Sequence, residues 1–179
     1  MSEPKFVPKT IYITYIASTP EKVWEALTSS EFTRRYFFGR SVEIEGKAGG
    51  RFAMRMPDGR FDIKGRVVEW DPPRRLQVTW AADFEEFGEL PESLVTYEIE
   101  PLGKSVKLTL TESHQWDVPD AILAGGRQGW PLILSSLKSV LEIGQPISID
   151  VPMGPPKGMI DAIRQAVATR PWRAAGLGR

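Results

Sequence analysis

The chain has 179 residues, with 23 basic residues balanced by 23 acidic ones, one histidine and no cysteine. This length suits one domain with a substantial core, and the balanced charge disfavours nucleic acid or an anionic membrane surface as a partner. The sequence excludes disulfides and thiolate metal sites, and it lacks the run of about 20 apolar residues that a membrane span needs. Because the N-terminus also lacks the apolar region of a signal peptide, the sequence predicts a cytoplasmic protein.

The first forty residues predict a strand followed by two short helices. Residues 10–17 are rich in β-branched and aromatic side chains, which favour a strand. A helix is expected over 18–27, with Ser18 or Thr19 as its cap and Pro20 in its first turn. The second helix is expected over 30–38 and should end at Gly39.

From residue 41 to residue 114 the apolar side chains recur with a period of two, which predicts an antiparallel meander. In one of these strands the apolar phase switches between Val67 and Val68, so a bulge or strong bend is expected there, helped by Gly65. The predicted strands cover 41–45, 51–56, 61–70, 75–82, 93–100 and 105–114.

Residues 120–144 carry the longest helical pattern of the chain. Three glycines precede the apolar stripe of this segment, and Pro131, which removes a helical hydrogen bond, lies near its start. We therefore expect a regular helix from Pro131 to Glu142, with residues 125–130 as an irregular approach to it. The alternatives are that the small residues let the backbone approach a ligand or pack closely on the sheet. The stripe consists of Trp130, Leu134, Leu137 and Leu141.

The composition changes after Gly144. Residues 145–158 are rich in proline and glycine, which disfavours regular structure, and helical spacing returns over 159–169. The sequence therefore predicts a domain over 1–144 and a C-terminal extension over 145–179, which either packs on the sheet or mediates dimerisation.

A sheet curled around one helix tends to leave an apolar space that binds small molecules. The bulky side chains in the inward phase either line such a cavity or fill the core, since protein interiors are normally close-packed. The candidate ligand-binding residues are Phe52, Met54, Phe61, Trp80, Tyr97, Leu110, Trp130 and Leu134.

Glu112 and His114 are the best acid–base candidates, because a carboxylate that orients an imidazole can tune it for proton transfer. If the alternation of apolar side chains along the predicted strand 105–114 continues, both residues face inward. The alternative is a polar pair at the rim of the sheet. A single histidine does not support a metal site, and the sequence contains no phosphate-binding or dinucleotide-binding motif, so no cofactor is expected.

Four segments in order carry a resemblance to a known family: PEKVWEALTSSEFTRRYF, GGRFAMRMPDGR, GRVVEWDPPRRLQVTW and GWPLILSSLKSVLE. Together they resemble the homologues of the activator of heat-shock protein 90 ATPase, a branch of the START-like or SRPBCC superfamily. The resemblance covers about residues 10–144. It implies an α+β helix-grip fold, in which a curved seven-stranded antiparallel sheet surrounds a long C-terminal helix and two short helices follow the first strand.

Three functions are consistent with these observations. The first is a noncatalytic protein that binds a small apolar or aromatic molecule between the sheet and the long helix. The second is an interaction module for a chaperone or another protein partner, including a second copy in a homodimer, through the acidic loop 83–89 or the tail. The third is an enzyme that uses Glu112 and His114 in the cavity.

Overall fold

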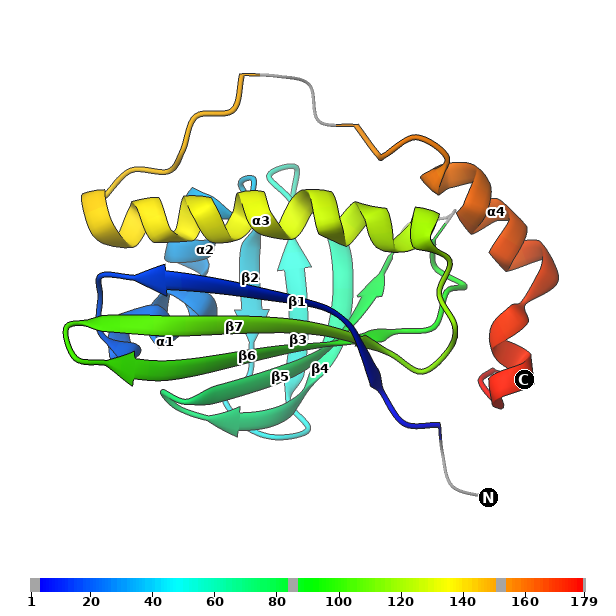
Figure 1. Cartoon of the computed structure of the whole chain (residues 1–179), viewed down its shortest axis with the longest axis horizontal. Coiled ribbons are helices and arrows are strands. Elements are labelled where there is room, and N and C mark those ends of the chain that lie inside the picture. Colours follow the sequence, from blue (N-terminus) through cyan, green and yellow to red (C-terminus); the bar gives the residue numbers. More distant parts are fainter. Residues whose placement is uncertain (1–3, 84–86, 151–153, 179) are drawn as a thin grey trace.

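A computed structural model describes residues 4–83, 87–150 and 154–178. It contains a curved seven-stranded antiparallel sheet with the strand order β1-β7-β6-β5-β4-β3-β2, and the long helix α3 lies across its concave side (Figure 1). The predicted helix-grip fold is therefore confirmed. The strands are β1 (Val7–Ile16), β2 (Ser41–Ile44), β3 (Arg51–Arg55), β4 (Phe61–Asp71), β5 (Arg75–Ala82), β6 (Ser93–Leu102) and β7 (Ser105–His114). The helices are α1 (Pro20–Thr28), α2 (Ser30–Tyr36), α3 (Asp120–Ile143), α4 (Met159–Thr169) and the 3-10 helix η1 (Pro171–Ala175).

The two short helices begin and end where the local sequence favours it. Thr19 caps α1, because its side-chain oxygen accepts a hydrogen bond from the backbone N–H of Lys22 at 3.3 Å, and Pro20 occupies the first helical turn. After α2 the backbone takes positive φ values at Phe38 and Gly39, which turns the chain into β2. Both predicted helices are present, with shifts of one or two residues at their ends.

Strand β4 is bent, as the change in its apolar phase predicts. Its pairing with β5 shifts register between Val67 and Glu69, which marks a bulge. Gly65 allows the close approach of the two strands, because a Cβ at this position would overlap the carbonyl oxygen of Thr79 and lie 2.7 Å from its carbonyl carbon. The bend therefore depends on a residue without a side chain.

Helix α3 differs from its prediction. It is continuous from Asp120 to Ile143 with Pro131 inside it, so the irregular approach expected over 125–130 is wrong. Packing explains the difference, because Leu123 and Trp130 are both buried and hold the N-terminal half of α3 against the rest of the molecule. Such contacts offset the loss of one helical hydrogen bond at proline.

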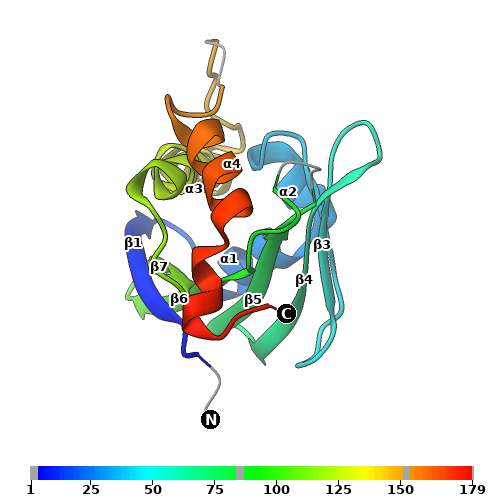
Figure 2. The ribbon, with the colours of Figure 1, turned by 90° about the vertical axis from the view of Figure 1, so that its right-hand side faces the viewer.

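Two hydrophobic clusters hold the molecule together. The main core fills the space between the concave face of the sheet and α3, whereas a second cluster joins the extension to the connection between β7 and α3 and to the start of α3. In the second cluster the rings of Trp116 and Trp172 lie 5.4 Å apart. Arg170 adds an ion pair to Glu89 at 2.9 Å. Figure 2 shows α4 beside the N-terminal half of α3, so the extension packs on the domain.

The C-terminal half of α3 also contacts the end of the edge strand β1. Lys138 Nζ donates a hydrogen bond to the carbonyl oxygen of Tyr15 at 2.6 Å. The backbone N–H of Ala17 donates to Glu142 at 2.8 Å, and Lys138 pairs with Glu142 at 2.9 Å. The hydrogen bond from Ala17, with that from Lys138, lowers the pKa of Glu142.

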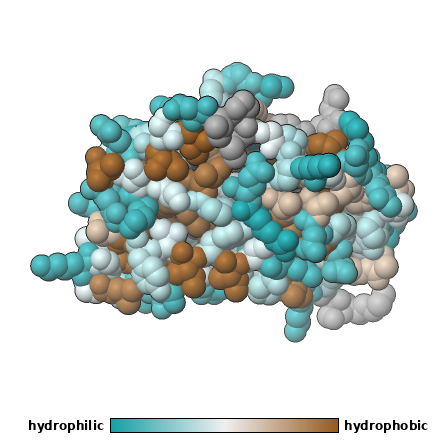
Figure 3. All heavy atoms as spheres, turned by 45° about the horizontal axis from the view of Figure 1, so that its top comes forward, coloured by the Kyte–Doolittle hydropathy of each residue, from teal (hydrophilic) through white to brown (hydrophobic). Residues whose placement is uncertain are grey.

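The surface over α3 and the extension is mixed in character. In Figure 3 hydrophobic side chains form separate spots among hydrophilic ones on this face. Among the helices of the described residues, none has the length and apolar character required to cross a membrane.

Candidate ligand-binding site

Two adjacent hollows lie where the N-terminal half of α3 meets the sheet. The smaller one, the Glu112 cavity, has a volume of about 230 Å³, and the larger one, the Met159 cleft, has a volume of about 570 Å³. The Glu112 cavity is lined by Phe37, Trp80, Ser93, Val95, Glu112, Gly125, Gly126, Gly129, Trp130 and Ile133. The Met159 cleft is lined by Phe37, Phe38, Arg40, Asp62, Ile63, Trp80, Gly125, Gln128, Gly129, Ile133, Gly154, Pro155, Pro156 and Met159.

An aromatic cluster at the edge of the main core borders these hollows. The ring of Trp80 lies 5.2 Å from that of Trp130 and 6.0 Å from that of Phe37, and Phe37 meets Trp130 edge-on at 5.8 Å. These distances are those of rings in direct contact, so the cluster itself leaves no room for a ligand between its members. A ligand in either hollow would therefore rest against the outside of the cluster.

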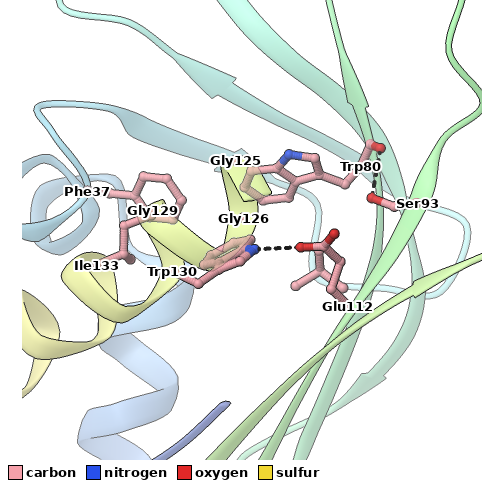
Figure 4. Close-up of a pocket in the computed structure, with 10 residues that line it drawn as sticks. Phe37, Trp80, Ser93, Glu112, Gly125, Gly126, Gly129, Trp130 and Ile133 are labelled. Carbon is pink, nitrogen blue, oxygen red and sulfur yellow. Dashed lines mark hydrogen bonds between the residues drawn. The ribbon is translucent and has the colours of Figure 1, made fainter. Parts of the chain in front are cut away.

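Glu112 is the polar anchor of the smaller cavity. The residue is 8% exposed, and its Oε2 accepts a hydrogen bond from Trp130 Nε1 at 3.1 Å (Figure 4). Its Oε1 lies 2.9 Å from His114 Nε2. A Cβ on Gly126 would lie 2.5 Å from Glu112 Oε2, so the glycine makes room for the carboxylate beside α3.

The charge of Glu112 acts beyond the cavity. Burial raises the pKa of Tyr12 on β1, and the negative charge of Glu112 adds to that effect. Ser93 supplies a second polar group to the cavity, although its hydroxyl donates to the carbonyl oxygen of Trp80 at 3.3 Å. The Glu112 cavity therefore combines an aromatic wall with a hydrogen-bonded carboxylate.

The Met159 cleft contains one charged pair among mostly apolar groups. Arg40 donates to Asp62 Oδ2 at 2.6 Å, and Asp62 is almost fully buried. Pairing of this kind lets a carboxylate remain in a buried wall without an isolated charge. The cleft therefore suits a largely apolar ligand.

Two of the eight predicted ligand-binding residues line these hollows, namely Trp80 and Trp130. Five others lie in the main core and line neither hollow: Phe52, Met54, Tyr97, Leu110 and Leu134. Their position fits the alternative that they fill the core.

Phe61 does not face inward, so that part of the prediction is wrong. The register of β3 and β4 shifts between Met54 and Arg55 and places Phe61 opposite Arg55. Its ring packs under guanidinium groups, with the Cζ atoms of Arg55 and Arg51 at 4.4 Å and 5.3 Å from the ring centroid. A bulge early in β4 has therefore turned Phe61 away from the core.

The structure brings Glu112 and His114 within hydrogen-bonding distance, and both side chains are largely buried. Both carboxylate oxygens of Glu112 already have partners, and among the described residues His114 Nδ1 has none. Glu112 lines the cavity, whereas His114 lines neither hollow. The catalytic role predicted for the pair stays a prediction.

Several lining residues were not predicted from the sequence. Phe37 belongs to the end of α2, and its position beside Trp80 depends on the turn at Phe38 and Gly39. Pro155, Pro156 and Met159 come from the extension, whose path no local pattern specifies. The glycines of α3 were the available signal, because residues that weaken a helix are often kept for a close contact.

Comparisons with known proteins agree with this architecture. The crystal structure of CalU16 from Micromonospora echinospora is 20% identical and covers 94% of this chain and 88% of its own, with a TM-score of 0.61. The Aha1 dimer from Colwellia psychrerythraea is 20% identical, with 75% and 96% covered and a TM-score of 0.59. An HSP90 activator from Plasmodium falciparum is 24% identical, with 68% and 86% covered and a TM-score of 0.55.

These structural likenesses show a shared fold. No curated protein matches the sequence. Residues 17–142, more than half of the chain, match the sequence model of one family, and the segments that carried the resemblance lie within this range. The chain therefore belongs to the family described as activator of Hsp90 ATPase homolog 1-like protein.

Proposed function

We propose that this protein binds a small apolar or aromatic molecule at the Met159 cleft. The observation that supports the proposal is the cleft itself, whose volume of about 570 Å³ lies within the range of about 300–1,000 Å³ typical of small-molecule sites. Phe37 and Trp80 offer aromatic faces, and Pro155 and Met159 add apolar groups from the extension. The nearby Glu112 cavity provides a polar end for a ligand that reaches it.

Trp80 and Phe37 are the two aromatic residues that line both hollows, and Trp80 has the larger ring, so its loss should weaken binding most. With 2-naphthol as a probe in isothermal titration calorimetry, we expect Trp80→Ala to weaken binding by about tenfold, equivalent to about 1.4 kcal/mol. Trp70→Ala is the matched control, since Trp70 packs 4.9 Å from Trp24 and lines neither hollow. Trp70→Ala should leave the dissociation constant within about twofold of the wild-type value.

A search for a natural ligand complements this titration. Native mass spectrometry after mild purification should show a mass above that of the chain alone, and aromatic compounds should raise the melting temperature. Unchanged melting with every compound, together with no 2-naphthol binding by the wild-type protein, would contradict a ligand-binding function.

The alternative function is a protein-interaction module. Its supporting observation is an exposed apolar stripe on β1, where Ile11, Ile13 and Tyr15 are 60%, 51% and 56% exposed and alternate along one face. Two structural neighbours are described as an Aha1 dimer and an HSP90 activator. Of the acidic loop 83–89 considered from the sequence, residues 84–86 lie outside the described residues, and Glu89 pairs with Arg170.

If a second copy covers this stripe, the wild-type protein should sediment as a dimer and the double variant Ile11→Glu/Ile13→Glu as a monomer. Two charges in an apolar contact would weaken it strongly, because each must lose water without gaining a partner. Val68→Glu is the control, since Val68 is also exposed but lies on β4. A monomeric wild-type protein at high concentration would exclude the homodimer, and an unchanged pull-down of a chaperone by the double variant would exclude the stripe as its binding surface.

A further inference from the structure

The extension is held against the domain at two separate places. In the second hydrophobic cluster the ring of Trp172 packs edge-on against that of Trp116. At the cleft, Gln128 on α3 donates a hydrogen bond to the carbonyl oxygen of Gly154 at 3.1 Å. These contacts lie on opposite sides of α4 in the sequence, so they fix the position of Met159, its first residue.

Met159 packs directly against α3, and the end of its side chain lies beside Gly125. A Cβ on Gly125 would lie 2.7 Å from Met159 Cε and 2.9 Å from Met159 Sδ. In a helix interior glycine is less favourable than alanine by about 1 kcal/mol, so Gly125 lowers the stability of α3 in return for this contact. The missing side chain at Gly125 therefore leaves room for the end of the Met159 side chain against α3.

The extension contributes a continuous apolar wall to the cleft. Pro155, Pro156 and Met159 line it together, whereas Phe37, just after α2, and Trp80 on β5 line it from the other side. The two prolines restrict the backbone, so this wall has little freedom to adapt to a larger ligand. The matched family segment ends at residue 142, and the wall therefore comes from a part of the chain outside it.

We propose that this wall limits the size of the ligand that the cleft accepts, and that Met159 is the size-determining residue. The inference rests on the proposed ligand-binding function and adds to it the segment that selects among ligands. Small apolar or aromatic molecules that fit between the wall and Trp80 should bind, and broader ring systems should meet the Met159 side chain.

The test compares a smaller and a larger aromatic probe on the full chain. Isothermal titration calorimetry with 2-naphthol and 1-hydroxypyrene gives a dissociation constant for each, and their ratio measures selection by size. Met159→Ala shortens the side chain to its Cβ, so we expect the ratio to shift in favour of 1-hydroxypyrene by roughly threefold or more.

Two control variants separate size from other effects. Met159→Leu keeps an apolar side chain of similar volume and should retain the wild-type ratio. Ile160→Ala removes apolar volume from the next residue of α4, which does not line the cleft, and should also retain it. Circular dichroism of each variant checks that the fold is intact.

The outcomes distinguish this inference from the function on which it rests. If the wild-type protein binds neither probe, the ligand-binding function fails and the size-selecting wall fails with it. If the wild-type protein binds 2-naphthol but Met159→Ala leaves the ratio unchanged, ligand binding stands and the wall does not select by size. A shift of equal extent in Ile160→Ala would also overturn the role of Met159.

Discussion

Gly65→Ala is expected to destabilise the protein by about 3 kcal/mol, because overpacking between backbones cannot relax through a side chain. The added Cβ would overlap the carbonyl oxygen of Thr79, so β4 and β5 would have to separate where the sheet bends. Chemical denaturation should show the loss directly. In thermal unfolding a domain of this size should melt about 6–12 °C lower.

A second glycine provides the control for this prediction. At Gly129 in α3 an added Cβ would have no heavy atom of the described residues within 4 Å. Alanine is the better helix former, so Gly129→Ala should stabilise the protein by up to about 1 kcal/mol. Equal effects of the two substitutions would show that the contact with Thr79 does not determine the cost at Gly65.

Glu112→Ala is expected to lower the free energy of unfolding by about 2–4 kcal/mol, since it removes the acceptor of buried donors. Trp130 Nε1 and His114 Nε2 would both lose their hydrogen-bond partner. Chemical denaturation at neutral pH measures the change. Glu112→Gln should cost less, because its amide oxygen can still accept from Trp130 and the imidazole can change tautomer to accept from the amide N–H.

A double-mutant cycle with Trp130→Phe isolates the contact between Glu112 and Trp130. Phenylalanine keeps an aromatic ring but removes the indole N–H, so its cost should be smaller in the Glu112→Ala background than in the wild-type protein. Additive effects would mean that the hydrogen bond with Trp130 contributes nothing measurable and that the loss in Glu112→Ala comes from its other contacts, including the one with His114.

The sheet was predictable because the sequence signals that specify its strands are local. Alternation and turn residues place the strands within a few residues, and the phase change at Val67 and Val68 marks the bulge that the structure contains. Phe61 was misplaced for a related reason. A bulge reverses the face of every residue before it, and the register shift near Arg55 leaves no distinct signal in the sequence.

The site was less predictable because long-range contacts determine it. Trp80, Trp130 and Glu112 were identified individually, yet the aromatic wall of the hollows depends on how the two indole rings pack with Phe37. The continuity of α3 through Pro131 likewise depends on tertiary packing. Packing of the extension against α3 is not visible in the local pattern of either segment.

The contacts of Lys138 and Glu142 with the end of β1 have a consequence for aggregation. An edge strand with free backbone groups can pair with a strand from another molecule. Here the carbonyl oxygen of Tyr15 and the N–H of Ala17 are engaged by α3. Strand addition is thereby obstructed at this end of the sheet, so a second copy that binds near Tyr15 would have to use side chains on the face of β1 rather than extend the sheet.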